Sequence, residues 1–446
     1  MSAVPASASL NPGVARREVW AWAMYDFANS GYTTVVLTAV FNAYFVSVVA
    51  GNAEWATFAW TAALSVSYAV VMLIGPPLGA WADAHAAKKG LLAISTVACI
   101  AGTVALAWCH AGSVAWAVLF IVVSNVAYSM GENLIAAFLP ELSRPEALGK
   151  VSGWGWSLGY FGGILALGLS LAWVMTAAAR GSTTSGAVPG TMVITAAIYG
   201  VAALPTFLWL RERAVPAATP GTRAAMARLV ETARSARRYV DLLLVFACGV
   251  FYQAGVATVI ALAAIYAEQV MGFKTQDTIM LVLVVNVTAA IGAFGFGYAQ
   301  DRLGKVVALR VTIVGWIAMT VIAYFSTTTP TFWVAANLAG LCMGSSQSAG
   351  RALVAYLSPP ERAAEFFGLW GVAVRLAAIL GPLTYGVVTW ITHGNHRLAI
   401  LLTGAFFFIS LIFLAFVSES RGRTQIVGSE SGVRVGGQSR GSESGL

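Results

Sequence analysis

Hydrophobic residues form long, nearly unbroken stretches along the chain, and polar residues gather in the short segments between them. Twelve stretches approach or exceed the roughly 20 residues that cross a bilayer as a helix. They lie at 19–49, 58–80, 91–110, 113–139, 151–178, 191–210, 240–267, 278–299, 306–326, 331–357, 364–391 and 397–417. Lipid offers the backbone no hydrogen-bond partner, and the stretches lack the alternation of barrel strands. The pattern therefore predicts an all-α membrane protein with twelve transmembrane helices.

Composition and charge support a membrane location and predict an orientation. The chain of 446 residues is 59% hydrophobic and 10% charged, whereas soluble domains carry about 25% charged residues. Among its 26 Lys and Arg, only Arg180, Lys274 and Arg397 fall in the odd-numbered loops. Basic loops stay in the cytoplasm, so both termini are predicted to be cytoplasmic, in a bacterial inner (plasma) membrane. The net charge of +8 is thus a topology signal and does not indicate nucleic-acid binding.

The stretches divide into two groups of six. Residues 1–18 form a cytoplasmic tail without the apolar core of a cleaved signal peptide. Residues 19–210 form the first six-helix bundle and residues 240–417 the second. Between them, residues 211–239 contain seven arginines and are expected to form a cytoplasmic linker that rests on anionic headgroups. Residues 418–446, rich in Ser, Gly and Arg, are expected to form a disordered cytoplasmic tail.

The two halves also repeat in sequence. "GAWADAHAAKK" begins at Gly79, and "GYAQDRLGK" begins at Gly297, 218 residues later. "LSRPEALGKVSG" ends at Gly153, and "LSPPERAAEFFG" ends at Gly368, 215 residues later. Two matches at nearly constant offset indicate a duplicated six-helix unit. Such parallel repeats are typical of transporters with a substrate path between their halves.

The second copy of the first repeat, G-x-x-x-D-R-x-G-K, resembles the loop signature of the major facilitator superfamily. Its aspartate can accept hydrogen bonds from a neighbouring helix N-terminus, and its cations keep the loop cytoplasmic. In the first copy, alanines replace the arginine, the second glycine and the basic residue, but two lysines follow. We expect these residues to gate access and not to bind substrate. They are Gly79, Asp83, Lys88, Lys89, Gly297, Asp301, Arg302, Gly304 and Lys305.

The resemblance narrows to the vacuole-effluxer-like branch of that superfamily. The segments that carry it are "WAMYDFANSGYTTVVLTAVFNAYF", "FLPELSRPEALGKVSGWGWSLGYFGG", "AIYAEQVMGF" and "ERAAEFFGLWGVAVRLAAILGP". The resemblance implies the major facilitator fold, with twelve helices in two pseudo-repeats. Fungal members of the branch are linked to export of amino acids from the vacuole, so an amino-acid-like solute is the implied substrate.

Polar residues inside the apolar stretches are the candidate substrate and proton sites, because polar groups in lipid are costly unless they have a function or a partner. Helix 1 contributes a polar face, and helices 4, 7, 8, 10 and 11 contribute the rest. The candidates are Tyr25, Asp26, Asn29, Thr33, Asn125, Glu132, Asn133, Gln253, Asn286, Gln347, Arg351 and Arg375.

Two of these candidates have alternative interpretations. Asp26 is either a substrate or proton site or a structural residue of the cytoplasmic gate. Arg375 is either the counter-ion of Asp26 or Glu132 or the anchor of a substrate carboxylate. We expect Asp26 and Asn29 to line the cavity, with Arg375 balancing the charge. Ala254 stands where relatives often carry an acid, which argues against a fixed proton-coupling set.

The sequence favours a secondary active transporter that works as an exporter over an enzyme. The cysteines, Cys99, Cys109, Cys248 and Cys342, show no metal spacing, and HExxH and P-loop patterns are missing. No cofactor or metal is expected. The expected partners are a small-molecule substrate, the bilayer and protons as coupling ion, with the protein acting as a monomer. Two alternatives remain open, a proton-coupled drug or metabolite efflux protein and a membrane sensor or scaffold that does not transport.

Overall fold

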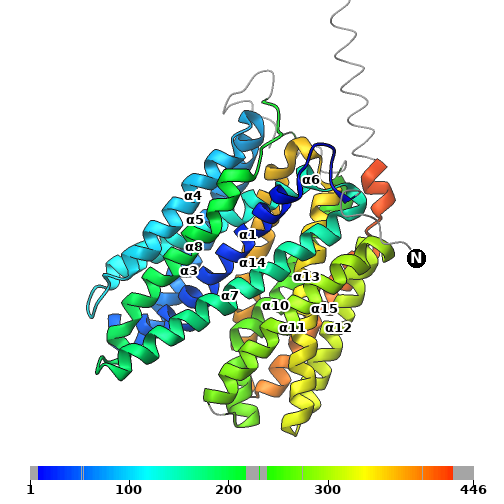
Figure 1. Ribbon diagram of the computed structural model, residues 1–446. Helices are drawn as coiled ribbons and strands as arrows, with labels where there is room; N and C mark the ends of the chain where they lie inside the picture. The colour runs from blue at the N-terminus through cyan, green and yellow to red at the C-terminus, as the bar shows by residue number, and fades with distance from the viewer. Residues whose placement is uncertain are drawn as a thin grey trace, which may run out of the picture.

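A computed structural model describes the chain from residue 9 to residue 424, except for residues 52, 54, 217–230, 232–238, 274 and 394. Helices account for nearly all of the described chain (Figure 1). Most of the basic linker and residues 425–446 of the predicted tail lie outside the described residues, as do residues 1–8.

The first half contains six long helices. They are α1 (Arg16–Tyr32), α3 (Ala56–His85), α4 (Lys88–Leu106), α5 (Val114–Ala136), α7 (Leu148–Ala179) and α8 (Thr184–Trp209). Helix α1 continues through a π-helical stretch (Thr33–Ala39), the short α2 (Phe41–Tyr44) and a second π-helical stretch (Phe45–Val49). The predicted single span 19–49 is therefore one membrane crossing with two widened segments. The short α6 (Leu139–Leu142) precedes α7.

The second half repeats the pattern. Its helices are α10 (Val240–Met271), α11 (Thr275–Leu303), α12 (Lys305–Phe325), α13 (Thr329–Leu357), α14 (Ala363–Ile391) and α15 (His396–Ala415). Within the described residues, eleven segments are long and apolar enough to cross a membrane. Helix α13 is the twelfth long helix; its 29 residues include many Gly, Ser and Thr, which lower its hydropathy. The predicted all-α fold with two six-helix groups is confirmed.

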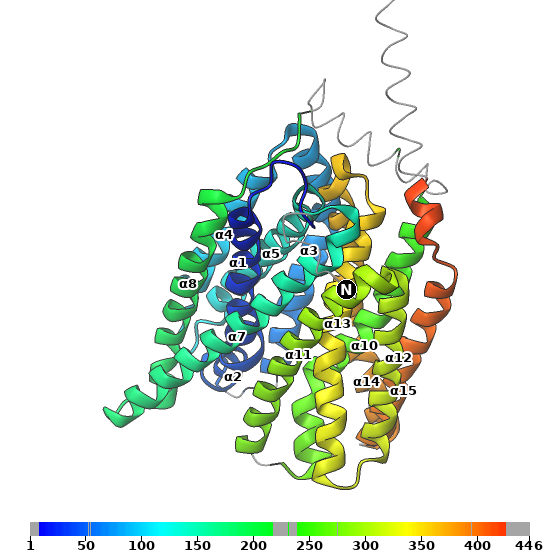
Figure 2. The same cartoon turned by 45° about the vertical axis from the view of Figure 1, so that its right-hand side comes forward.

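The two halves form two bundles that lie side by side and diverge toward one end (Figures 1 and 2). Helices α7 and α11 pack against each other across the boundary between the halves, and α3 packs against α14 in the same way. In the repeat these two contacts are equivalent, because α3 corresponds to α11 and α7 to α14. The boundary is thus held by two pseudo-symmetric helix pairs.

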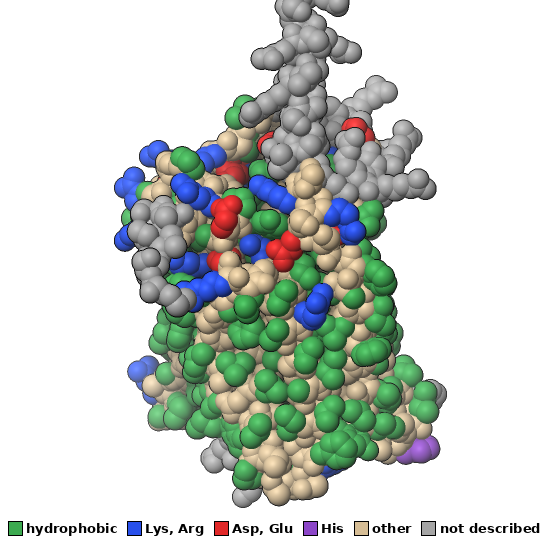
Figure 3. Space-filling view, turned by 90° about the vertical axis from the view of Figure 1, so that its right-hand side faces the viewer, with side chains coloured by type: hydrophobic (Ala, Val, Ile, Leu, Met, Phe, Trp, Pro, Cys, Tyr) green, Lys and Arg blue, Asp and Glu red, His purple; other side chains and the backbone are tan. Residues whose placement is uncertain are grey.

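Charged side chains gather at one end of the molecule. Figure 3 shows Lys, Arg, Asp and Glu side chains at that end, above a broad belt of hydrophobic side chains. Large hydrophobic side chains are exposed on several helices, among them Leu73, Val201, Phe325 and Leu383, which a lipid environment explains. We call the end that contains residues 211–216 and the described parts of both tails the charged end, and the other the opposite end.

Candidate functional site

A cavity of about 460 Å³ lies between the two halves. Ten of the predicted site residues line it, namely Asp26, Asn29, Thr33, Glu132, Asn133, Gln253, Asn286, Gln347, Arg351 and Arg375. The lining continues to Thr38, Tyr266 and Phe332, which lie near the ends of their helices away from the charged end. The cavity therefore runs from the middle of the molecule toward the opposite end.

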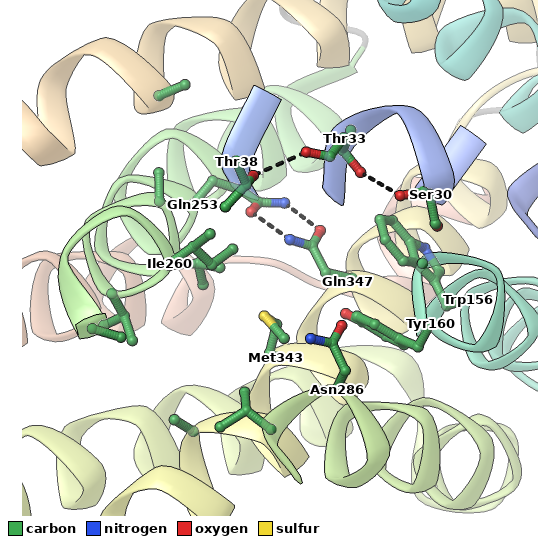
Figure 4. Close-up of a pocket in the computed structure, with 18 of the residues that line it drawn as sticks. Ser30, Thr33, Thr38, Trp156, Tyr160, Gln253, Ile260, Asn286, Met343 and Gln347 are labelled. Atoms are coloured by element: carbon green, nitrogen blue, oxygen red, sulfur yellow. Dashed lines mark hydrogen bonds between the residues drawn. The ribbon is translucent and has the colours of Figure 1, made fainter. Parts of the chain in front are cut away.

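Aromatic side chains form much of the remaining wall. Trp156 and Tyr160 of α7 face Gln347 and Asn286 of the second half across the cavity (Figure 4). Trp316 also contributes to the wall. A wall of this kind suits a ligand with an apolar part, and a few polar groups would fix its orientation.

The first ion pair of the cavity joins α1 to α13. Arg351 Nη1 donates to Asp26 Oδ2 at 2.7 Å, and both side chains are largely buried. Arg351 also donates through Nε to Ser152 Oγ and through Nη2 to the Ser152 carbonyl. Its guanidinium lies 4.7 Å from the ring centre of Trp22 and 5.3 Å from that of Trp156. Arg351 is thus bonded on its edge and covered on its faces.

The second ion pair joins α5 to α14. Arg375 Nη2 donates to Glu132 Oε2 at 2.7 Å. The ring of Tyr68 lies 5.6 Å from the guanidinium. Arg375 Nε is buried and has no hydrogen-bond partner among the described residues.

The partner of Arg375 corrects one expectation. Arg375 was expected to balance Asp26, but the structure pairs it with Glu132 and pairs Asp26 with Arg351. The alternative that Arg375 is the counter-ion of Glu132 agrees with the structure. Asp26 and Glu132 both line the cavity, so depth along the helix alone could not show which of them pairs with Arg375.

Two glutamines bridge α10 and α13 in the cavity wall. Gln253 Nε2 donates to Gln347 Oε1 at 2.8 Å, and Gln347 Nε2 donates to Gln253 Oε1 at 3.0 Å (Figure 4). Gln253 Nε2 also donates to the Tyr252 hydroxyl at 3.5 Å, whereas Gln347 keeps one N–H without a partner among the described residues. Asn286 lines the wall nearby and donates to the Val282 carbonyl of its own helix.

Two predicted candidates, Tyr25 and Asn125, lie away from the cavity lining. The Tyr25 hydroxyl bonds to Thr96 at 2.8 Å within the first half. Asn125 Nδ2 donates to Ser67 Oγ at 2.6 Å. Both side chains are buried among helices of the first half. A polar residue in a transmembrane helix can therefore face a neighbouring helix instead of the cavity, and the sequence does not distinguish the two.

Three other candidates of the first half do line the cavity. Asn29 Oδ1 accepts a hydrogen bond from the buried Tyr199 hydroxyl at 2.5 Å. Thr33 donates to the Ser30 carbonyl and its own carbonyl accepts from Thr38, which fixes the π-helical turn (Figure 4). Asn133 Nδ2 is buried without a partner among the described residues.

Close backbone contacts shut the boundary at the charged end. A Cβ added to Gly79 of α3 would lie 2.2 Å from the Ala364 carbonyl oxygen of α14. A Cβ added to Gly153 of α7 would lie 2.5 Å from the Ala293 carbonyl oxygen of α11. Glycine is required at both positions because the helices almost touch. The cavity is therefore closed at the charged end.

The aspartates of the repeated loop signature cap helices of the other half. Asp301 accepts hydrogen bonds from the backbone N–H groups of Gly149 at 2.9 Å and Lys150 at 2.7 Å, at the start of α7. Asp83 accepts from the backbone N–H of Glu365 at 2.9 Å, at the start of α14. A carboxylate at a helix N-terminus is favourable because the first N–H groups lack partners within the helix.

The basic residues of the signature support the aspartates. Lys305 Nζ lies 3.7 Å from Asp301, and Lys88 Nζ lies 3.8 Å from Asp83. Lys88 also forms a short ion pair with Glu141. Lys88 therefore plays the same role as Lys305, although it lies one residue further along its loop. Aligning the two loops by sequence places Ala87, not Lys88, opposite Lys305.

The turn of the loop signature has a positive φ in both copies. Gly304 has a φ of 92°, and Ala86, the residue at the equivalent position, also has a positive φ of 48°. Alanine in this conformation is strained. Lys89 donates to the Leu210 carbonyl, and Arg302 is exposed to solvent.

A second repeated pair of glutamates, which was not predicted from the sequence, caps the N-termini of α4 and α12. Glu212, just after α8, accepts from the backbone N–H groups of Lys88 and Lys89. Glu419, just after α15, accepts from the backbone N–H of Val306. The sequence pattern that could have predicted these caps is a glutamate followed within two residues by an arginine after the last helix of each half. It was overlooked because both copies lie in segments assigned to the linker and the tail.

The arginines that follow these glutamates tie down the first helix of each half. Arg213 pairs with Glu18 at 2.9 Å, and Arg421 pairs with Asp241 at 2.6 Å. The second contact raises the pKa of Arg421 further above its usual value through hydrogen bonds and charge. The charged end of each half is therefore closed by the same set of contacts.

Comparisons with solved structures place the fold among major facilitator superfamily transporters. The human organic anion transporter MFSD10 (TETRAN) superposes with a TM-score of 0.72 at 14% identity, over 90% of this chain and 99% of that one. The proton:xylose symporter XylE superposes with a TM-score of 0.71 at 14% identity, over 91% and 97%. At this identity the likeness shows the fold alone. The fold is therefore that of the major facilitator superfamily, and the family match described next makes the chain a transporter of this superfamily and not an enzyme.

Sequence comparison identifies the family. The model of the vacuole effluxer Atg22-like family matches residues 43–427, so the chain belongs to that family. The uncharacterized MFS-type transporter YxiO of Bacillus subtilis is 30% identical over 89% of this chain and 94% of its own. Autophagy-related protein 22-1 of Neosartorya fischeri is 24% identical over 61% of this chain, which spans about half (49%) of that protein. The resemblance inferred from the motifs is confirmed.

Proposed function

We propose that this transporter moves a small zwitterionic, amino-acid-like solute out of the cytoplasm by alternating access. The charged end is the cytoplasmic end in this proposal, so the cavity described above is open to the outside. Protons are the coupling ion.

The observation that carries the proposal is the division of charge across the cavity. The first half supplies two carboxylates, Asp26 and Glu132, and the second half supplies two guanidinium groups, Arg351 and Arg375. Each pair spans the boundary between the halves near the closed end. Opening that end separates acids from bases.

Separated charges need new partners in a low-dielectric site. A zwitterion meets this need, because its ammonium can bind a carboxylate of the first half and its carboxylate an arginine of the second. A proton can neutralise either acid in its place. Substrate and proton thus act on the same contacts, which is the requirement for coupling.

Transport into and out of proteoliposomes tests the proposal. Liposomes containing the purified protein are loaded with a mixture of the standard amino acids, and release of each is followed with and without an imposed pH gradient. We expect release of a subset of zwitterions, faster when protons flow in the opposite direction. Release equal to that from protein-free liposomes for every amino acid would refute the amino-acid proposal, and a sensor or scaffold would then explain the cavity better.

A further inference from the structure

The two ion pairs of the cavity differ in how fully their arginines are bonded. Arg351 donates three hydrogen bonds and lies against two tryptophan rings. Within the described residues, Arg375 donates one hydrogen bond, to Glu132, and its buried Nε lacks a partner. A guanidinium has five N–H donors in a planar fork. Arg375 therefore has unused donors, whereas those of Arg351 are largely occupied.

The carboxylates differ in the same direction. The side chain of Glu132 is 32% exposed, and that of Asp26 is 11% exposed. Since both residues line the cavity, the exposed surface of Glu132 is the part that a ligand can reach. A second buried donor without a described partner, Asn133 Nδ2, follows Glu132 directly on α5 and lies against Gly371 of α14, one turn from Arg375.

Helix α7 supplies the residues that surround the Asp26–Arg351 pair. Ser152 accepts twice from Arg351 and donates its own hydroxyl to the Ser348 carbonyl of the second half. A Cβ added to Gly155 would lie 2.3 Å from Asp26 Oδ2 and 2.6 Å from Arg351 Nη2. The pair therefore fills the space on its α7 side, and although both residues line the cavity, the bonds to Asp26 and Ser152 leave Arg351 few donors for a ligand carboxylate.

From these differences we infer a division of labour between the two pairs. Arg375, with Asn133, binds the carboxylate of the ligand, and Glu132 is the acid that the ligand ammonium or a proton reaches. Asp26 and Arg351 form a latch that holds the charged end closed and does not contact the ligand. The assignment of the ligand carboxylate to Arg375 rests on the proposed function. The latch does not, because it concerns only the contact between the two halves.

The latch is tested without any ligand. In a background lacking the four native cysteines, Ser348 is replaced by cysteine as a reporter, because its side chain is fully buried at the boundary. Labelling by a membrane-impermeant maleimide from the charged end measures opening there. Asp26→Asn should raise the labelling rate by about tenfold or more, which corresponds to a shift of about 1.4 kcal/mol. The matched change in the other pair, Glu132→Gln, removes a contact that also crosses the boundary but is more exposed, so it should raise the rate by no more than about threefold.

Folding is controlled with neutral double variants. Asp26→Asn leaves Arg351 buried without its counter-ion, which destabilises folded proteins. The double variant Asp26→Asn/Arg351→Gln removes both charges and should still raise labelling. Its counterpart, Glu132→Gln/Arg375→Gln, should raise labelling by no more than about threefold. Equal labelling of the two double variants, in either direction, would overturn the latch.

The ligand part is tested with two probes, the mixture of standard amino acids and the same mixture as C-terminal amides, which lack the carboxylate. The amino acids should alter the labelling rate of the parent, and the amides should not. Arg375→Lys should raise the half-maximal amino-acid concentration by about tenfold, because an ammonium cannot replace the planar fork. Arg351→Lys should leave that concentration within about threefold.

The two failures are distinguishable. If the amides act as well as the amino acids, or if Arg351→Lys weakens the response more than Arg375→Lys, the assignment of the carboxylate to Arg375 is wrong. If neither probe changes the labelling rate although the latch variants behave as expected, the amino-acid function fails and the latch stands. In that case the ligand role of Arg375 is rejected together with the amino-acid function.

Discussion

Replacement of Asp301 by asparagine removes the charge of one helix cap and keeps its size. In the closed charged end Asp301 accepts two backbone N–H groups of α7, from Gly149 and Lys150. Asparagine can accept one of them through Oδ1, but its amide group faces the other. The substitution therefore costs one charge-assisted hydrogen bond and the attraction between a carboxylate and a helix N-terminus.

The expected magnitude follows from these two losses. A hydrogen bond to a charged group contributes about 1.5–3 kcal/mol, and a carboxylate at a helix N-terminus about 0.3–1 kcal/mol. Because α7 and α11 belong to different halves, both contributions vanish when the charged end opens. The closed form should lose about 2–4 kcal/mol relative to the open form, which shifts their ratio by about 30- to 700-fold.

The assay is labelling of the Ser348→Cys reporter from the charged end, with transport rate measured in parallel. Asp83→Asn is the matched change in the other half, since the Glu365 N–H at 2.9 Å is the main donor to Asp83 and asparagine can still accept it, with Ala364 as a weaker second donor. Its shift should be about tenfold or less. Transport rate should change more than the half-saturating substrate concentration. A reporter that labels no faster in Asp301→Asn than in Asp83→Asn would refute the reasoning.

Three further outcomes are expected. Reporter domains fused after Arg213 and after Arg421 should both show cytoplasmic activity, because the basic loops lie at that end; an external signal from either would reverse the orientation. Gly79→Ala should hold the charged end open, because its methyl group would overlap a carbonyl of the facing helix, whereas Gly168→Ala, with open space around it, should behave as wild type. Ala86→Gly should raise the melting temperature, because it relieves a left-handed conformation that costs about 1–2 kcal/mol for a residue with a Cβ; an unchanged or lower value would contradict this.

Sequence alone could predict the parts of the structure that depend on local pattern. Twelve helices followed from hydropathy, since a span needs only length and apolar side chains. The duplication followed from loops whose spacing is the same in both halves, and it placed Asp83 and Asp301 at equivalent positions. Both aspartates do cap helices of the opposite half, as their chemistry suggested.

The choice of counter-ions could not be predicted, because it depends on which helices meet across the boundary. Asp26 and Arg351 are 325 residues apart, and no repeat relates them. Depth along a helix placed Arg375 equally well opposite Asp26 or Glu132. The bonds of Ser152 and the space left by Gly155 decide the first pair, and neither residue stands out in the sequence, because one is small and polar and the other has no side chain.

The division of charge between the halves also bears on how the chain assembles. At the charged end the halves are alike, since each offers a carboxylate and a helix N-terminus to its neighbour, so two copies of either half could close there. In the cavity they are opposites, with acids at Asp26 and Glu132 and bases at Arg351 and Arg375. Two first halves brought together would bury four carboxylates against one another, and two second halves would bury four guanidinium groups. Divergence after duplication has therefore made each half a partner for the other and a poor partner for itself, which gives the evolutionary advantage of carrying both in one chain.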